Sequence, residues 1–210
     1  MTTLLMLAPV LGALTVGAMS PGPSFIYVAR TSVAGSRSEG VAAAVGMGIG
    51  GMIYGGLVLL GLQAVLTRVG WLFLGLKIAG SLYLIYLGIG LWRAARKPLV
   101  ETATDAVPNT VSRAFVQALF TQLSNPKTLV VYGSIFAALL PRDLPTSAAW
   151  TLLALVFAIE MGWYALVALA LSATAPRQAY LRSKVVIDRF AGTVLGLLGL
   201  KLLLAADSTR

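Results

Sequence analysis

The sequence predicts an all-α integral membrane protein in which six transmembrane helices form two inverted repeats of three. Three observations lead to this prediction. Hydrophobic residues make up 58% of the chain and charged residues only 11%, against about 25% charged residues in ordinary globular domains. Several long stretches carry no charge, and a membrane-spanning helix needs only about 20 apolar residues. Finally, a proline motif interrupts a long apolar segment in each half of the chain.

The apolar segments divide into six expected spans. The first begins without the basic residues of a signal peptide, so we expect it to be a transmembrane helix. Leu-, Ala- and Gly-rich runs of this length lack the alternation of a membrane β-barrel and favour helices. The spans are 3–33 with a break at 21–23, 41–65, 70–92, 113–139 with a break near 126, 147–174 and 186–206.

The longest polar segment, at 93–113, suits a flexible connector between two halves of a single membrane domain, and we place the connector, on the cytoplasmic side, at 98–112. We therefore expect one three-helix repeat at 1–97 and a second at 113–210. A short similarity supports this division, because Lys77-Ile-Ala-Gly-Ser81 resembles Arg189-Phe-Ala-Gly-Thr193 in the order of residue types. Three spans in each half give the two repeats opposite orientations in the membrane.

The basic residues predict the orientation, because Lys and Arg concentrate in the cytoplasmic loops of membrane proteins. One side holds only Arg68, Arg142 and Arg210. The other side, which we expect to face the cytoplasm, holds Arg30, Arg37, Arg93, Arg96, Lys97, Arg113, Arg177, Arg182, Lys184 and Arg189. The sequence thus predicts a multi-pass protein of a bacterial inner membrane with both termini external.

Composition also removes several classes of function. The net charge of +9 is spread over loops beside apolar spans, where the lipid bilayer explains it better than nucleic acid does. The chain has neither cysteine nor histidine, so we expect no thiolate chemistry, no metal site and no cofactor. Ser124-x-x-Lys127 matches a Ser-Lys nucleophile pattern, but its companion motifs are missing, so we expect no enzyme and no catalytic residue.

The first break, at Pro21, Gly22 and Pro23, is a candidate binding site. Proline lacks an amide donor and glycine allows unusual backbone angles, so the helix should open here. The half-helix that follows, from Ser24 onward, presents free amides and a positive dipole end that can bind a carboxylate. The alternative is a packing kink satisfied by neighbouring helices.

The second break, at Asn125, Pro126 and Lys127, has the same character. Asn125 can cap the following half-helix, and Pro126 suits its first turn. Lys127 places an ammonium group deep in the span, where each charge costs at least about 2.5 kcal/mol. Broken helices in corresponding halves of a membrane protein indicate a transport site.

Glu160 is the second deep charge. We expect it to exchange a proton or to contact the ammonium group of a substrate, while Lys127 contacts the carboxylate or pairs with Glu160 in one conformation. A purely structural salt bridge is the alternative. Tyr54 and Tyr164 are candidates to line the cavity, although aromatic residues are also common in helix packing.

Several motifs resemble those of the lysine exporter (LysE/RhtB) family of amino-acid efflux proteins, in family order and over nearly the whole chain. Glu160 departs from the family, which more often has Asp at this position, and the longer side chain affects the expected substrate size. The matching motifs are Ser20-Pro21-Gly22-Pro23-Ser24-Phe25, the Gly-rich segment 40–61, Lys77-Ile78-Ala79-Gly80 with the following Tyr83 to Gly88, Asn125-Pro126-Lys127 and Glu160-Met161-Gly162-Trp163-Tyr164.

The resemblance implies efflux, and the residues add the expected substrate. Because Glu160 is opposed by several lysines, we expect a small amino acid or derivative with no net charge, exported by alternating access in exchange for protons. Alternatives are export of another small solute or a metal ion, or a non-transporting assembly subunit. Whether the protein forms a homo-oligomer is left open.

Overall fold

The computed structural model describes residues 2–20, 22–68, 70–96, 110–141, 143–172 and 174–207. Every regular element among these residues is an α-helix, which confirms the predicted all-helical class. Most of the predicted connector, at 98–109, lies outside the described residues. The eight helices of the described residues are α1 (Thr2–Met19), α2 (Pro23–Ala34), α3 (Arg37–Arg68), α4 (Gly70–Ala94), α5 (Val111–Leu123), α6 (Pro126–Leu139), α7 (Thr146–Leu171) and α8 (Thr174–Asp207).

Three parts of the described chain have the length and hydropathy of a membrane span. One lies in α3, at Arg37–Gly61, and α7 provides another over its whole length. The bent pair of α1 and α2 forms the third, and shorter apolar helices occur within α4 and α6. These helices agree with an integral membrane protein.

Both predicted helix breaks are present. α1 and α2 are bent by 55° across the first break, where Gly22 precedes Pro23 at the start of α2. At the second break, Asn125 is the N-cap of α6 and Pro126 is its first residue. Proline suits this position because the first helical turn leaves its amides without intrahelical partners. Pro21 lies outside the described residues.

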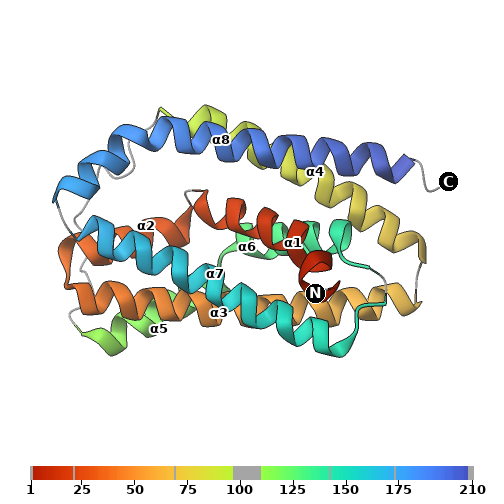
Figure 1. Ribbon diagram of the computed structural model, residues 1–210, viewed down its shortest axis with the longest axis horizontal. Coiled ribbons are helices and arrows are strands. Elements are labelled where there is room, and N and C mark those ends of the chain that lie inside the picture. The colour runs from red at the N-terminus through yellow and green to blue at the C-terminus, as the bar shows by residue number, and fades with distance from the viewer. Residues whose placement is uncertain are drawn as a thin grey trace.

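α4 and α8 form a pair that lies above the other helices in Figure 1. They run in opposite directions, because Gly88 of α4 approaches Gly192 of α8 while Ser81 approaches Gly199. A Cβ atom added at Gly88 would lie 2.5 Å from the carbonyl oxygen of Gly192. The two backbones are therefore in close contact, as small residues at membrane-helix interfaces permit.

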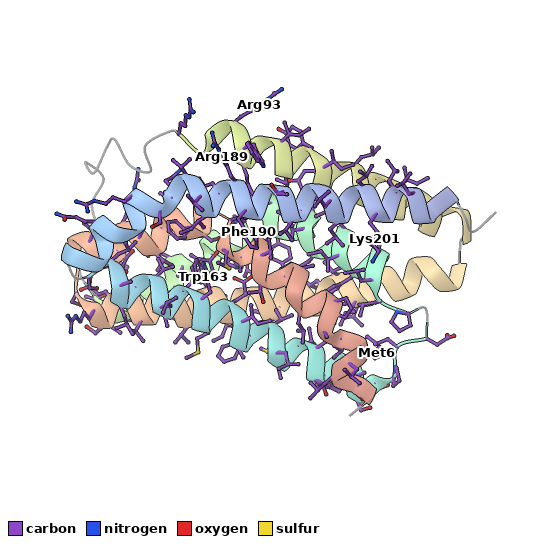
Figure 2. The ribbon with its side chains drawn as sticks, turned by 45° about the horizontal axis from the view of Figure 1, so that its top comes forward. Met6, Arg93, Trp163, Arg189, Phe190 and Lys201 are labelled. Atoms are coloured by element: carbon purple, nitrogen blue, oxygen red, sulfur yellow. The ribbon has the colours of Figure 1, made fainter. Side chains whose placement is uncertain are left out.

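Side chains mark the two ends of the α4–α8 pair. Figure 2 shows Arg93 and Arg189 in one part of it and Lys201 farther along α8 toward the C-terminus. The Arg189 guanidinium lies over the Trp92 ring, 5.0 Å from its centroid, and Trp92 donates a hydrogen bond to Thr193 at 3.1 Å. The basic and aromatic groups thus gather at the end of α4 that precedes the connector.

Below this pair, α3 packs against α5 and α7, and its glycines allow the close approach. A Cβ atom added at Gly46 would lie 2.5 Å from the carbonyl oxygen of Phe115 in α5. One added at Gly51 would lie 3.0 Å from Cγ of Glu160 in α7. The glycines of this span therefore permit close contacts between α3 and its two neighbours.

The sixth predicted span, 186–206, is only part of a longer helix, since α8 begins at Thr174. Pro176 lies in its first turn, where no amide donor is required, and the following Arg, Gln, Ala and Leu residues favour a helix. Their polarity limits the apolar span without ending the helix. As a result Lys184, expected among the cytoplasmic loop charges, lies within α8 and is buried.

Candidate functional site

Glu160 lies on α7 with only 4% of its surface exposed. The hydroxyl group of Tyr132, from α6, donates to its Oε1 at 2.8 Å. The side-chain amide of Gln122, from α5, donates to its Oε2 at 3.3 Å. Hydrogen bonds offset the cost of removing a polar group from water, so three helices converge to keep this carboxyl group inside an apolar helix.

A chain of polar side chains leads from Glu160 to both helix breaks. Ser24, just after the first break, donates to Oε1 of Gln122 at 2.5 Å. Asn125, at the second break, donates from Nδ2 to Oγ of Ser24 at 2.8 Å. All three residues are buried. The two breaks are therefore joined by hydrogen bonds and share one polar network with Glu160.

Lys127 connects the breaks a second time. Its Nζ donates to the carbonyl oxygen of Ser20 at 2.8 Å and to the hydroxyl oxygen of Ser20 at 2.7 Å, with a longer contact of 3.5 Å to the carbonyl oxygen of Gly17. Carbonyl groups at the end of a helix lack intrahelical partners and attract cations. The ammonium group thus occupies the open end of α1.

Lys127 and Glu160 do not pair directly in this conformation. Among the described residues, the ion pair present is that of Lys184 with Asp188. The Lys127 ammonium instead uses neutral oxygen acceptors, and Glu160 uses neutral donors. An acidic and a basic side chain therefore line the same region without a direct ion pair between them.

A cavity of about 20 Å³ lies between these groups. A cavity needs roughly 10–15 Å³ to hold one water molecule, so this space suits about one. Its walls come from both sides of the first break, from the half-helix that follows the second break, and from α7. The lining residues are Leu14, Gly17, Ala18, Ser20, Gly22, Ser24, Asn125, Lys127, Thr128, Val131, Tyr132, Glu160 and Tyr164.

Most of the predicted site residues meet at this cavity. Pro23 and Pro126 begin the two half-helices that point into this region, while Pro21 lies outside the described residues. The predicted residues in the lining are Gly22, Ser24, Asn125, Lys127, Glu160 and Tyr164.

Tyr54 lies elsewhere. Its hydroxyl group donates to the carbonyl oxygen of Leu123, at the end of α5, and thereby satisfies a backbone group freed by the second break. It also lines a second cavity, of about 680 Å³, between α3, α4 and α6. The structure thus places Tyr54 behind the second break instead of in the Glu160 cavity.

Two members of the network, Gln122 and Tyr132, are absent from the predicted site. A glutamine within an apolar span is itself a signal, because polar side chains in membrane helices usually face the interior of the bundle. Tyr132 gives no such signal, since it cannot be told from a packing aromatic in sequence. Ser20, the first residue of the motif at the first break, accepts hydrogen bonds from Lys127.

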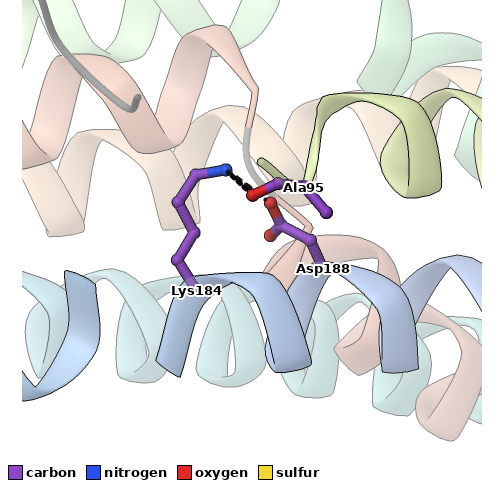
Figure 3. Close-up of polar contacts among 3 residues, drawn as sticks. All are labelled: Ala95, Lys184 and Asp188. Carbon is purple, nitrogen blue, oxygen red and sulfur yellow. Dashed lines mark hydrogen bonds and ion pairs between the residues drawn. The ribbon is translucent and has the colours of Figure 1, made fainter. Parts of the chain in front are cut away.

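A second buried carboxylate lies outside the cavity. Asp188 of α8 is 1% exposed, and its Oδ2 accepts from Nζ of Lys184 at 2.7 Å. Lys184 also donates to the carbonyl oxygen of Ala95, just after α4, at 3.2 Å (Figure 3). Sequence analysis did not single out Asp188, because its burial depends on how α8 packs against its neighbours.

The sequence is similar to those of known membrane transport proteins. The profile of the family described as LysE type translocator matches residues 15–206. The threonine efflux protein of Escherichia coli (strain K12) is 32% identical over 198 residues, which are 90% of this chain and 93% of that protein. No solved structure shows a significant match.

Two further relatives extend the comparison. The uncharacterized membrane protein YahN of Escherichia coli (strain K12) is 31% identical over 199 residues, which cover 95% of this chain and 89% of that protein. The homoserine/homoserine lactone efflux protein of Salmonella typhimurium (strain LT2) is 34% identical over 139 residues, with 66% of each chain covered.

Proposed function

Because the chain belongs to the LysE type translocator family, we propose that it exports a small amino acid from the cytoplasm. The relatives named for their function are efflux proteins for threonine and for homoserine or its lactone. Proteins of this family are transporters, so the chain is not an enzyme, as its sequence predicts.

The cavity between the two breaks carries the proposal. Glu160 offers a carboxylate that suits an ammonium group, and Lys127 offers an ammonium group that suits a carboxylate. The half-helices that begin at Pro23 and Pro126 add positive dipole ends near the same point. A molecule with both charges and no net charge, such as a neutral amino acid, complements this arrangement.

The volume of the cavity supports alternating access. About 20 Å³ holds one water molecule and no amino acid, so the helices must move apart before a substrate can enter. A substrate carboxylate would draw the Lys127 ammonium away from Ser20, which releases the end of α1 from α6. Movement of the half-helices then opens the site to one side of the membrane at a time.

Helix pairing supports an inverted repeat of two three-helix units, 1–97 and 113–210. In such a repeat, α1, α2, α3 and α4 correspond to α5, α6, α7 and α8, and a two-fold axis in the membrane plane exchanges the two sets. Helices that correspond can then pack against each other, as α3 with α7 and α4 with α8. A contact between α1 and α6 must be matched by one between α5 and α2. All four contacts are present. Each half then crosses the membrane three times, with the broken pairs α1–α2 and α5–α6 as single spans.

We assign the end of the α4–α8 pair that carries Arg93 and Arg189 to the cytoplasm, following the positive-inside rule. Both termini are then external, and the protein lies in the inner membrane of a bacterium. Glu160 is the proposed carrier of the exchanged proton, because it is a buried carboxyl group whose partners lie on the two sides of the second break, Gln122 before it and Tyr132 after it. Protonated Glu160 would replace bound substrate on the return step.

Counterflow in proteoliposomes tests the function. Liposomes are loaded with unlabelled L-threonine, L-homoserine or another amino acid, and entry of the labelled compound is followed. We expect saturable exchange for one substrate class, loss of exchange in Lys127→Ala, and loss of proton coupling in Glu160→Gln. Lys201→Ala and Asp143→Asn are the matched controls, because both residues are exposed and lie outside the cavity. Absence of exchange in folded wild-type protein would contradict amino-acid transport.

A further inference from the structure

Asp188 is a buried carboxylate with one unused oxygen. Its Oδ2 is paired with Lys184, but no donor among the described residues reaches its Oδ1, which is also buried. Each oxygen of a carboxylate can accept about two hydrogen bonds, and a buried acceptor without a donor is costly. Buried polar atoms of this kind are rare and need a reason.

Lys184 is held in a way that leaves this oxygen to another donor. Its ammonium group is shared between Oδ2 of Asp188 and the carbonyl oxygen of Ala95, as Figure 3 shows. Ala95 directly follows the last residue of α4, so Lys184 also satisfies a carbonyl at that helix end. Two acceptors fix the lysine on one side of the carboxylate.

The position of Asp188 links it to the Glu160 cavity. α8, which carries Asp188, packs against α1 and α7, and both of these helices line the cavity. Ala95 lies at the end of α4 that carries Arg93, the end assigned to the cytoplasm. In the proposed orientation Asp188 therefore lies on the cytoplasmic side, on a helix that packs against the walls of the cavity.

We propose that Oδ1 of Asp188 is a docking point for the ammonium group of the substrate, between the cytoplasm and the Glu160 cavity. This inference rests on the proposed export of an amino acid. A primary ammonium group brings three donors, and a charge-assisted bond to the free oxygen removes the cost of leaving it unpaired. The same ammonium group then passes to Glu160 as the half-helices move.

Three variants separate docking from a structural role of the ion pair. Asp188→Asn removes the negative charge and leaves the Lys184 ammonium without its ion-pair partner. The double variant Lys184→Met with Asp188→Asn removes both charges, so that no uncompensated charge stays buried. Asp188→Glu keeps both the charge and a partner for Lys184. Counterflow of labelled L-threonine and L-homoserine is measured in proteoliposomes of defined orientation, together with thermal unfolding of each variant.

We expect Asp188→Asn to raise the half-saturating concentration at the cytoplasmic face by about tenfold or more, as loss of a charge-assisted bond does. The value at the external face should not change. The double variant should regain the unfolding temperature of the wild type and keep the raised half-saturating concentration. Asp188→Glu should stay within about threefold of the wild type.

A double variant with wild-type half-saturation at both faces would show a structural pair and overturn the docking role. So would a double variant that fails to fold. If the wild type exchanges no amino acid, the proposed function fails and this inference fails with it. Exchange by the wild type with unaltered variants would overturn this inference alone.

Discussion

Glu160 stays inside an apolar helix because Tyr132 and Gln122 donate to its two oxygens. Its importance could be predicted from sequence, since a charge within an uncharged run of this length is costly. The same holds for Lys127. The donors could not be predicted, because their roles depend on which faces of α5 and α6 meet α7. That choice is made by tertiary packing, through contacts such as Gly51 against Glu160.

Tyr132→Phe tests the value of one donor. The variant leaves Oε1 of Glu160 without its hydrogen bond, so we expect the free energy of unfolding in detergent to fall by about 1–3 kcal/mol. Tyr86→Phe is the control, because Tyr86 is 67% exposed, and its effect should stay within about 0.5 kcal/mol. Equal effects of the two variants would show that the hydroxyl group of Tyr132 is not needed to hold Glu160.

Asn125 has two separable roles. Its Oδ1 accepts from the backbone amide of Lys127 at 3.0 Å as the N-cap of α6, and its Nδ2 donates to Ser24. We expect Asn125→Ala to cost about 1 kcal/mol or more of stability, because it loses the cap and the link. Asn125→Asp keeps the cap acceptor but not the donor, so it should be more stable than the alanine variant and still impaired in counterflow. An aspartate variant with wild-type exchange would show that the link between the breaks is dispensable.

At the scale of helices, the two breaks could be predicted because proline acts locally, through its missing amide and fixed dihedral angle. The start of α8 could not. The apolar pattern marks where a helix enters lipid, whereas polar residues with good helix propensity extend it into water. The pairing of α4 with α8 could not be predicted either. Nothing in the sequence distinguishes Gly88 from Gly90, but of these two only Gly88 contacts the backbone of another helix.

The pair Gly88 and Gly90 therefore provides a matched test on one helix. A Cβ atom at Gly88 would collide with the carbonyl oxygen of Gly192, whereas one at Gly90 meets nothing within 4 Å. We expect Gly88→Ala to cost about 1–3 kcal/mol of stability, since the helices must move apart. Gly90→Ala should be neutral or stabilising by up to about 1 kcal/mol. Thermal unfolding of both variants in detergent measures this, and equal stability would contradict the close α4–α8 contact.

In the whole molecule, the two breaks lie against each other although they belong to different halves of the chain. Sequence reasoning predicted two matching breaks and a shared site, because broken helices in both halves serve one purpose in transporters. The network that joins them could not be predicted, because hydrogen bonds across the bundle follow from the packing of all the helices. The cavity volume is likewise a property of the closed bundle.

The proposed topology can be measured with introduced cysteines, since the chain has none of its own. Ser38 and Ser147 are both exposed, and the proposed orientation places Ser38 in the cytoplasm and Ser147 outside. In intact cells, a membrane-impermeant maleimide should therefore label Ser147→Cys and not Ser38→Cys. Permeabilised cells should show labelling of both variants, which controls for reactivity. Labelling of Ser38→Cys alone in intact cells would invert the topology.

Protection of a cysteine in the cavity tests the central claim, that the space between the two breaks binds the substrate. Thr128 lines this cavity, and Thr128→Cys would be the sole thiol of the chain. Its rate of modification is measured in proteoliposomes with and without L-threonine or L-homoserine, with Ser147→Cys as the control. We predict that a transported amino acid slows modification of Thr128→Cys and leaves that of Ser147→Cys unchanged. An unchanged rate in a Thr128→Cys variant that still performs counterflow would place the substrate elsewhere.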